Sequence, residues 1–573
     1  MKTDRNRLVR FICLGCALFL INGLVFLYYQ NTVSKTGGMF VYHLDDTYIH
    51  LAIAKNAAFY GNWGVTRDEF TSCSSAPAYT ALIGFLMKLF GNNEMLPLAV
   101  NLIFGNLIIL ALYAFMRDSL WFLIMTFFLC VPVLLHLQIL SGMEHTMHIF
   151  VILAAFMLFL KCNEGEFRDK RLWAFFLVMT SLLCLTRYES MFFVVPVLVV
   201  LLLNKRYVLT AQTFTAGFLP VLLFGLWSIS KGGFFFPNSL LMKGTGIIFS
   251  GGGIMEIAKM AVYYTCKLYY QLFILPMFMV PVAIMLIIIV KSLVTGGHPV
   301  SVSGLILTLK KYAVVFIPLT TILLHALFST VQFQWRYEAY LLSLLYLALI
   351  ILIREHIRAN KGEIVTFAVI FTVFALPGIV GRLEISHTVL TYGGKNIHDQ
   401  QIQMAKFLNA HYNDAMVMAN DIGAICYYTN IKLKDLVGLG STDVLTAKKE
   451  MLRDVRTLYN NYRMKDLVKA GSIDALGIGK LLSGDMTNVI LRNKRYNVIM
   501  VYDNWFKIKS EDDYKRLGWT KVGWLEIKDN VVCGVPVVSF YSSDETMAED
   551  MRNNMVRFFN ENTPADVGIY VYK

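Results

Sequence analysis

The chain has 573 residues, of which 56% are hydrophobic and only 16% are charged. Its mean hydropathy of +0.55 reflects more apolar surface than a soluble core uses, so the composition excludes an ordinary soluble protein and predicts a polytopic membrane protein. The formal net charge of +13 does not indicate a nucleic-acid partner. Lys and Arg fall mainly in short loops between apolar runs, where the positive-inside rule and contact with anionic membrane lipids explain them.

The N-terminus has the basic flank of a signal peptide, with Lys2, Arg5, Arg7 and Arg10 ahead of an apolar run at residues 11–29. This run is long enough to span a bilayer, and no small-residue cleavage site follows it. We therefore predict a retained signal anchor whose N-terminus lies in the cytoplasm.

Apolar segments recur along the first two thirds of the chain. Twelve of them are candidate transmembrane helices, at residues 11–29, 76–91, 96–116, 119–139, 144–160, 172–186, 190–203, 208–229, 271–290, 312–328, 338–353 and 364–380. Basic loops at 161–171, 205–206, 291–311 and 354–361 alternate with less basic loops, which predicts that all four are cytoplasmic. A cytoplasmic N-terminus and an external C-terminal region require an odd number of crossings. We predict about 11 transmembrane helices, with either 76–91 or 96–116 failing to cross.

Two external loops and a C-terminal domain complete the predicted layout. Residues 30–75 form one loop, in which 46–59 is predicted to be a helix along the membrane surface, and residues 230–258 form the other. After Arg382, β-branched runs at 415–418, 498–502 and 535–541 alternate with polar helical stretches at 399–411 and 446–462. We predict a transmembrane domain at 1–381 and an extracytoplasmic soluble α/β domain at 382–573.

The cysteines and histidines predict no metal site. The nine cysteines form no CxxC pair, and Cys426 and Cys533 in the C-terminal region are either a disulfide or two separate buried thiols. Glu144, His145 and His148 share one helical stretch but lack a fourth ligand. A divalent cation is possible at such residues but is not indicated, and no other cofactor is predicted.

Asp45 and Asp46 are adjacent carboxylates just beyond the first transmembrane segment. Repulsion between them should raise the pKa of one, and such a pair can supply a general base and an orienting or metal-binding carboxylate. Both are equally well explained as solvated loop residues or as caps of the following helix. The dipeptide alone leaves these readings open.

Other charged and polar residues fall at predicted outer ends of helices, on the same face as Asp45 and Asp46. They are Glu144, Arg187, Glu189, Asn238, Lys243, Arg336 and Tyr337. Charges at a membrane interface are functional candidates, and Arg187 and Lys243 have the chemistry to hold a lipid phosphate. Each of these residues also has an alternative interpretation. Lys243 could be a snorkelling lysine, Arg187 and Glu189 could form a structural ion pair, and Arg336 could be an interface anchor. Asp421 and Asp435 are acceptor contacts or turn residues.

Several short motifs occur in one order along the chain. They are Asp45-Asp46-Thr47-Tyr48-Ile49, Asn56, Gly61 to Gly64, Ser74-Ser75-Ala76-Pro77-Ala78-Tyr79-Thr80, Ser141-Gly142-Met143-Glu144, Thr186-Arg187-Tyr188-Glu189, Phe236-Pro237-Asn238-Ser239 with Lys243, Asn420-Asp421-Ile422-Gly423-Ala424 and Asp435-Leu436-Val437-Gly438-Leu439. This series resembles bacterial membrane-embedded glycosyltransferases of the C-type fold (GT-C). It is most similar to the subgroup containing the mycobacterial terminal arabinofuranosyltransferase, with its DDAYI, SPLWT, GxE, TRPE, PNTxxxK and DxGA...DLxGL motifs. Tyr188 stands where proline is usual in these motifs, and Ala76, Ala78 and Tyr79 also differ from the family pattern. These differences leave the identity of the transferred sugar open.

The resemblance implies an inverting glycosyltransferase that moves a sugar from a polyprenyl-phosphate donor to a hydroxyl of a glycan, lipid or protein. It places the chain in the bacterial cell (inner) membrane as a multi-pass protein acting on the extracytoplasmic face. Asp45 or Asp46 would be the base, with Asp45 favoured because it precedes the helix and can face the cleft. Donor phosphate would contact Lys243, Arg187, Asn238 and Arg336, and Tyr48, Glu144, Glu189, Tyr337 and Asp421 would bind substrate or support the site. A transporter or flippase of lipid-linked saccharide, and a non-catalytic scaffold on the same fold, are the alternatives. The absence of an internal repeat and the gathering of charges at one face disfavour the transporter.

Overall fold

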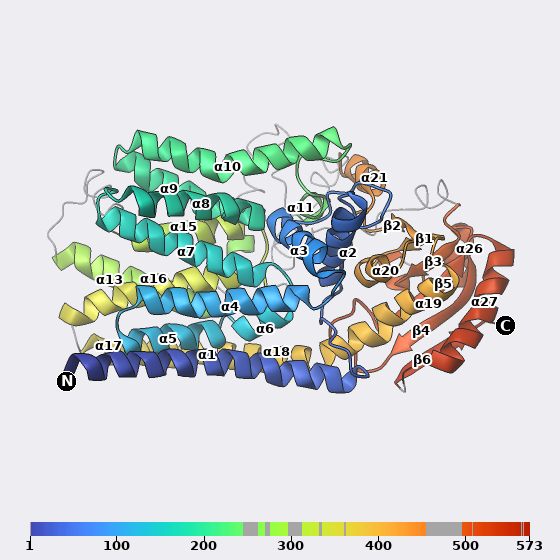
Figure 1. Cartoon of the computed structure of the whole chain (residues 1–573), viewed down its shortest axis with the longest axis horizontal. Coiled ribbons are helices and arrows are strands. Elements are labelled where there is room, and N and C mark those ends of the chain that lie inside the picture. Colours follow the sequence, from blue (N-terminus) through green and yellow to red (C-terminus); the bar gives the residue numbers. More distant parts are fainter. Residues whose placement is uncertain are drawn as a thin grey trace.

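The computed structural model describes residues 2–243, 262–269, 276–295, 312–331, 335–359, 362–453, 495–506, 508–562, 564 and 566–572. A bundle of apolar helices forms one half of the molecule and a mixed α/β region forms the other (Figure 1). The N-terminus lies at the free end of the bundle, and the C-terminus lies at the opposite extreme, beyond the sheet. The coarse prediction of a helical membrane part followed by an α/β region is therefore confirmed.

The bundle consists of helices of different lengths that run roughly parallel to one another (Figure 1). They are α1 (Lys2–Lys35), α4 (Leu96–Phe115), α5 (Ser119–Cys130), α6 (Leu135–Leu140), α7 (His145–Glu164), α8 (Lys170–Thr186), α9 (Met191–Leu203), α10 (Tyr207–Ser230), α13 (Pro276–Thr295), α15 (Ala313–Phe328), α16 (Ala339–Ala359), α17 (Glu363–Phe374) and α18 (Leu376–Ile397). α7 and α16 are buried along most of their length, whereas α1 and α10 expose large apolar side chains such as Phe19 and Leu223. Apolar residues on every face are what a helix surrounded by lipid and other helices requires.

In the part of the chain that the structure describes, five helices are long and apolar enough to cross a membrane. They are Arg5–Lys35, Leu96–Phe115, His145–Glu164, Tyr207–Ser230 and Ala339–His356, and the bent pair Val365–Phe374 and Leu376–His411 would make a sixth. Further apolar helices are shorter. The segment at 76–91 is one of these: α3 (Pro77–Phe90) has 14 residues, about 21 Å of helix against a hydrocarbon core of about 30 Å. The number of 11 crossings stays a prediction.

The basic loops described by the structure lie at the end of the bundle that carries the N-terminus. Arg10 of α1 donates to the Tyr113 carbonyl at the end of α4, at 3.0 Å, and Arg206 donates to the Glu166 carbonyl, at 3.5 Å. The N-terminal end of α1 and the loops at 161–171 and 205–206 therefore share one end, as their charge predicts. Most of the loop at 291–311 lies outside the described residues.

The junction between the bundle and the α/β region is built around α2 (Asp45–Tyr60), which packs against α3 and against α20 (Gly423–Tyr428). The predicted helix at 46–59 is confirmed, and its place along the membrane surface stays a prediction. Residues from Thr47 to Ala54 are buried because neighbours cover α2 on both sides. Gly61, with φ of 68°, ends the helix in the left-handed conformation that glycine adopts most readily.

Among the described residues, the α/β region holds a six-stranded sheet of order β2-β1-β3-β5-β4-β6. Its strands are β1 (Met416–Ala419), β2 (Lys432–Asp435), β3 (Val498–Val501), β4 (Thr520–Ile527), β5 (Val537–Ser542) and β6 (Val567–Val571). β1 pairs in parallel with β2 and β3, and the remaining pairs are antiparallel. The predicted β-branched runs correspond to β1, β3 and β5. The carboxyl end of β1 leads into residues 420–422 and α20, so this edge of the sheet faces α2.

Helices flank the sheet and connect it to the bundle: α19 (Gln403–His411), α21 (Thr442–Arg453), α26 (Glu511–Arg516) and α27 (Glu545–Asn562). The change of sequence pattern at Arg382 falls inside α18, so a continuous helix joins the two parts. Arg382 is buried and pairs with Glu338 at 2.6 Å. Cys426 and Cys533 are both free and buried. Of the two alternatives, a disulfide or two separate thiols, the structure therefore has two separate thiols. The later part of the predicted helix at 446–462 lies outside the described residues.

Candidate active site

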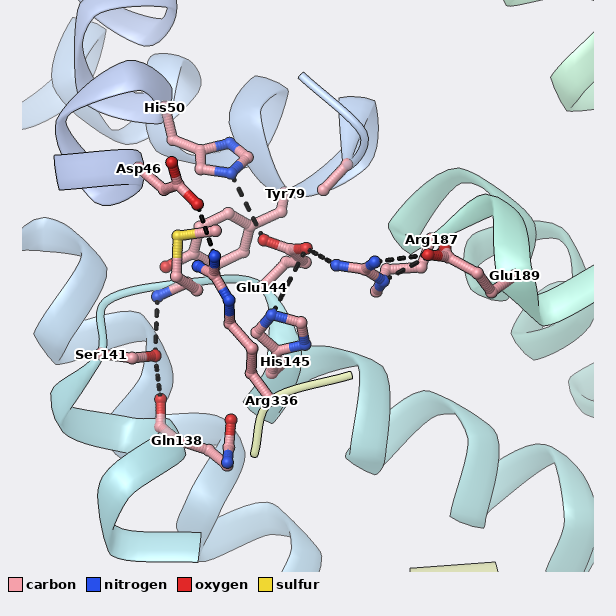
Figure 2. A network of polar contacts seen from close by, with 12 residues as sticks. Asp46, His50, Tyr79, Gln138, Ser141, Glu144, His145, Arg187, Glu189 and Arg336 are labelled. Atoms are coloured by element: carbon pink, nitrogen blue, oxygen red, sulfur yellow. Dashed lines mark hydrogen bonds and ion pairs between the residues drawn. The ribbon is translucent and has the colours of Figure 1, made fainter. Parts of the chain in front are cut away.

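Predicted site residues from distant parts of the sequence meet at the end of the bundle that adjoins α2 (Figure 2). Asp46 lies in the first turn of α2, Glu144 immediately precedes α7, Arg187 follows α8, and Arg336 precedes α16. Each therefore sits at a helix end, where a polar side chain can reach neighbouring helices without interrupting an apolar face. The prediction that these residues lie together at one end is confirmed.

Glu144 and Arg187 form the buried centre of this network. The Glu144 carboxylate accepts from Arg187 and lies 3.3 Å from His50 Nε2 and 3.9 Å from His145 Nε2. Arg187 also holds Glu189 with two contacts, at 2.5 Å and 3.2 Å. Burial disfavours the charged form of Glu144, whereas the Arg187 guanidinium beside it favours that form. The arginine thus bridges two carboxylates, and breaking such a buried set by removing one member is costly.

His50, Ser74 and Thr80 belong to the same network and were missed by the sequence analysis as site residues. His50 Nδ1 lies 2.7 Å from Thr80 Oγ1 and 3.3 Å from Ser74 Oγ. These contacts orient the ring so that Nε2 faces Glu144. Two signals were available: His50 stands four residues after Asp46 on one helix face, and Ser74 and Thr80 lie within a recognised motif.

Asp46 is the carboxylate that opens to a cavity. Its Oδ2 accepts from Arg336 Nη2 at 2.6 Å, and its side chain is 33% exposed whereas that of Arg336 is 3% exposed. Both line a cavity of about 40 Å³ that also includes His50, Ser74, Ser75 and Tyr337. The Tyr337 ring lies 5.3 Å from the Arg336 guanidinium and 5.0 Å from that of Arg187. Arg336 is therefore an interior residue and not an anchor at the lipid-facing rim.

A second cavity, of about 140 Å³, adjoins the first. The two share Ser75, Arg187, Ser239 and Tyr337 as lining residues. The wall of the second cavity is otherwise largely apolar, with Met191, Phe192, Phe236, Leu240 and Phe328. An apolar chamber with an arginine at its mouth, next to a cavity holding a carboxylate, suits an amphipathic ligand with an anionic head.

Asp45 points to the α/β region. Its two carboxylate oxygens accept from the backbone N–H groups of Gly423, at 2.7 Å, and Ala424, at 2.8 Å, and it does not line either cavity. Successive residues on a helix are about 100° apart, so Asp45 and Asp46 face different neighbours. The expectation that Asp45 faces the cleft is wrong.

The remaining predicted residues mostly hold the surroundings in place. Asn238 begins α11 (Asn238–Lys243), donates to the Leu439 carbonyl at 2.9 Å, and lies beside the cavity residue Ser239. Asp421 accepts from Tyr502 at 2.5 Å and from Gln401 at 2.8 Å. Tyr48 is fully buried among Tyr42, Tyr427 and Tyr428.

The predictions for Lys243 and Asp435 differ in how far the structure tests them. The side chain of Lys243 lies outside the described residues, so its proposed phosphate contact stays a prediction. Asp435 accepts from the backbone of Val437 and Gly440, each at 2.7 Å. That geometry identifies Asp435 as a turn residue.

Metal ligation has no geometric support within the described ranges. These residues contain no group of three or more His, Cys, Asp or Glu side chains placed to hold a metal ion. His148, which the sequence places near Glu144, contacts Ser190 Oγ at 2.8 Å.

The environment of Asp45 predicts a pH-dependent joint between α2 and the α/β region. Burial, together with the carboxylates of Asp421 and Asp46, raises the pKa of Asp45 to about 8, although the two N–H donors act in the opposite direction. An unfolded Asp ionises near pH 4, so the unfolded chain loses this proton first. The contribution of Asp45 to stability should therefore decrease from about pH 4 to about pH 8 and then level off.

Comparing thermal unfolding of the parent and Asp45→Asn across this range measures the effect. The Tm difference, parent minus variant, should decrease with rising pH up to about pH 8. A difference that stays constant or increases would contradict the predicted direction. The subtraction removes the contributions of all other titrating groups that the substitution leaves unchanged.

Two stretches of the chain match models of protein families. Residues 74–229, from the loop before α3 to the last turn of α10, match the model described as dolichyl-phosphate-mannose-protein mannosyltransferase. Residues 395–548 match a domain of unknown function, DUF8728. A search of the curated proteins found no match. With the apolar helices, the first match indicates a multi-pass membrane protein, and it supports a GT-C glycosyltransferase that uses a polyprenyl-phosphate sugar donor.

Proposed function

We propose that the protein is an inverting glycosyltransferase that acts on the extracytoplasmic face of the membrane and transfers a sugar from a polyprenyl-phosphate donor to an acceptor hydroxyl. One observation carries this proposal. A partly exposed carboxylate, Asp46, lies beside Arg336 in a cavity that continues into an apolar chamber with Arg187 at the junction. This order of groups matches the order of parts in the donor, in which a sugar is joined through phosphate to an apolar chain.

In the proposed reaction, Asp46 accepts the proton of the acceptor hydroxyl as its oxygen attacks the anomeric carbon. The bond between that carbon and the phosphate oxygen breaks, its electron pair leaves with polyprenyl phosphate, and attack from the opposite side inverts the configuration. Arg336 holds the carboxylate in position. Arg336 and Arg187 line the cavity wall where the departing phosphate would lie, and each would donate to it beside the carboxylates that it already holds.

The membrane face follows from charge. Basic loops collect at the end of the bundle opposite Asp46, and basic loops are typically cytoplasmic. We therefore propose that residues 382–573 are extracytoplasmic and lie over the site, with residues 1–381 forming the transmembrane domain. A bacterial inner membrane, the arabinofuranosyltransferase subgroup and a role for Lys243 at the phosphate belong to the same proposal.

The activity can be tested with purified protein in lipid vesicles and a panel of polyprenyl-phosphate sugars that includes mannose and arabinose. Mass spectrometry should detect free polyprenyl phosphate together with a glycosylated acceptor. If no donor in the panel is consumed above the background of Asp46→Asn, the proposal fails. Movement of intact donor across the vesicle membrane without release of sugar would instead favour a flippase.

The apolar chamber leads to a prediction about donor chain length. Leu240→Trp adds an indole to the wall of a cavity of about 140 Å³, so an isoprenoid chain should fit poorly. The KM for a long-chain donor should rise by about tenfold, whereas a short-chain donor should be affected much less.

The matched control is Leu226→Trp on α10, where the side chain is 52% exposed on the outside of the bundle. This variant should keep the parent KM for both donors. Equal changes for long and short donors in Leu240→Trp would show that the chamber does not hold the chain.

A further inference from the structure

A third cavity, of about 720 Å³, lies along α2 from the candidate active site. It is formed by the last turns of α2, the loop between α3 and α4, and the end of α20. Its main polar and aromatic lining residues are Lys55, Tyr60, Asn92, Asn93, Glu94, Tyr427 and Tyr428. We infer that this cavity binds a neutral oligosaccharide, the chain of the acceptor, and this inference rests on the proposed glycosyltransferase function.

Aromatic rings supply the first half of the recognition chemistry. Tyr427 and Tyr428 lie edge to face with ring centroids 4.8 Å apart and form one wall. Tyr60 and Phe90 are 50% and 69% exposed and present ring surface at the opening. A sugar ring has an apolar C–H face and a polar rim, so it packs on such rings while its hydroxyls reach polar neighbours.

The loop between α3 and α4 supplies the second half. Asn92 Oδ1 accepts from Tyr427 at 3.0 Å, Asn93 Oδ1 accepts from the Met95 N–H at 2.8 Å, and Glu94 accepts from Tyr428. These bonds fix the side-chain oxygens. Within the described residues neither amide nitrogen donates a hydrogen bond, so two N–H₂ groups remain as donors for hydroxyl oxygens.

The charge of the cavity favours a neutral ligand. Lys55 and Glu94 are its charged lining residues and have opposite signs. Lys55 Nζ donates to the carbonyls of Tyr427, at 2.5 Å, and Cys426, at 3.4 Å. With one positive and one negative side chain, both held by neighbours, the cavity has no excess charge for a phosphate or carboxylate. Its volume lies within the usual range of ligand sites, about 300–1,000 Å³.

The position of the cavity defines the acceptor further. Asp46 and Lys55 are nine positions apart on α2, or about 14 Å along the helix axis, and nine steps of about 100° place them on opposite faces of the helix. A ligand in the cavity would place its reacting hydroxyl at Asp46 only if it extends over that distance and around α2. The preferred acceptor is therefore a chain of several sugars, bound at residues away from its reacting end.

Binding of neutral trisaccharides of mannose, glucose, galactose and N-acetylglucosamine to the detergent-solubilised full chain tests the inference. Saturation-transfer NMR should detect binding of at least one of them, and the corresponding monosaccharide should bind much more weakly. Tyr60→Ala and Asn92→Ala should each weaken binding by about tenfold. Phe59→Ala is the matched control, because Phe59 is an equally exposed aromatic neighbour that does not line the cavity, and it should bind as the parent does.

The outcomes separate this inference from the proposed function. No binding by any trisaccharide, or equal weakening by Phe59→Ala and Tyr60→Ala, would overturn the oligosaccharide site, even if donor turnover continues. Site-specific binding without consumption of any polyprenyl-phosphate sugar would support the site while removing the transferase proposal. Thermal unfolding of each variant confirms that it is folded before binding is compared.

Discussion

Asp46→Asn is expected to lower the rate of sugar transfer by a factor on the order of 10² or more. The amide keeps an oxygen that can accept from Arg336 but cannot take the acceptor proton. Asp46 lines the cavity and Asp45 does not, so Asp45 cannot take over the role of base when Asp46 is replaced. Initial rates of polyprenyl phosphate release, with donor affinity measured separately, give the effect on the chemical step.

Asp45→Asn is the matched comparison because it makes the same chemical change one residue earlier. Its carboxylate accepts two backbone N–H groups, and the asparagine amide can accept only one of them through its oxygen. We expect Asp45→Asn to act mainly on the joint between α2 and α20, with a smaller loss of kcat. Near-normal turnover by Asp46→Asn, or a larger kcat loss for Asp45→Asn, would reverse the assignment of the base.

Gly423→Ala should produce a large structural effect for a single methyl group, at the contact between α20 and α2. A Cβ at Gly423 would lie 2.1 Å from the backbone oxygen of Asp45 and 2.8 Å from its Oδ2. Backbone cannot yield as a flexible side chain does, so α20 must move away from α2. Overpacking of this kind typically costs about 1–3 kcal/mol, and the displacement should also remove most of the transfer activity.

Thermal unfolding and transfer rate together measure this prediction. Gly381→Ala, on α18, is the control, since a Cβ there meets no atom within 4 Å and should leave both quantities close to the parent. Parent-like stability and turnover in Gly423→Ala would show that the contact between α2 and α20 can open without consequence for the site.

The helices of the bundle and the strands β1, β3 and β5 could be predicted because their apolar patterns are local. The gathering of Asp46, Glu144, Arg187 and Arg336 could also be predicted, since charge in the loops orients each helix. Which of these side chains pair with one another could not be predicted. Arg336 meets Asp46 across 290 positions of sequence, a contact that depends on the tertiary packing of the helices.

The different roles of Asp45 and Asp46 could not be predicted from the sequence for a similar reason. The sequence shows two identical side chains, and their difference comes from the rotation of α2 relative to α20. The burial of α2 could not be predicted from its sequence, because His50 and Asn56 are polar residues that are satisfied by interior partners. A buried polar residue with a partner looks the same in sequence as an exposed one.

The joint between α2 and α20 also bears on recombination between related proteins. The two family matches, at 74–229 and 395–548, both begin after α2, so exchanging modules at those boundaries would leave Asp45 with a foreign partner loop. Gly423 tolerates no side chain there and its N–H must meet a carboxylate. Chimeras should therefore function only when residues 45–60 and 420–428 are inherited from the same parent, even though more than 350 positions separate them.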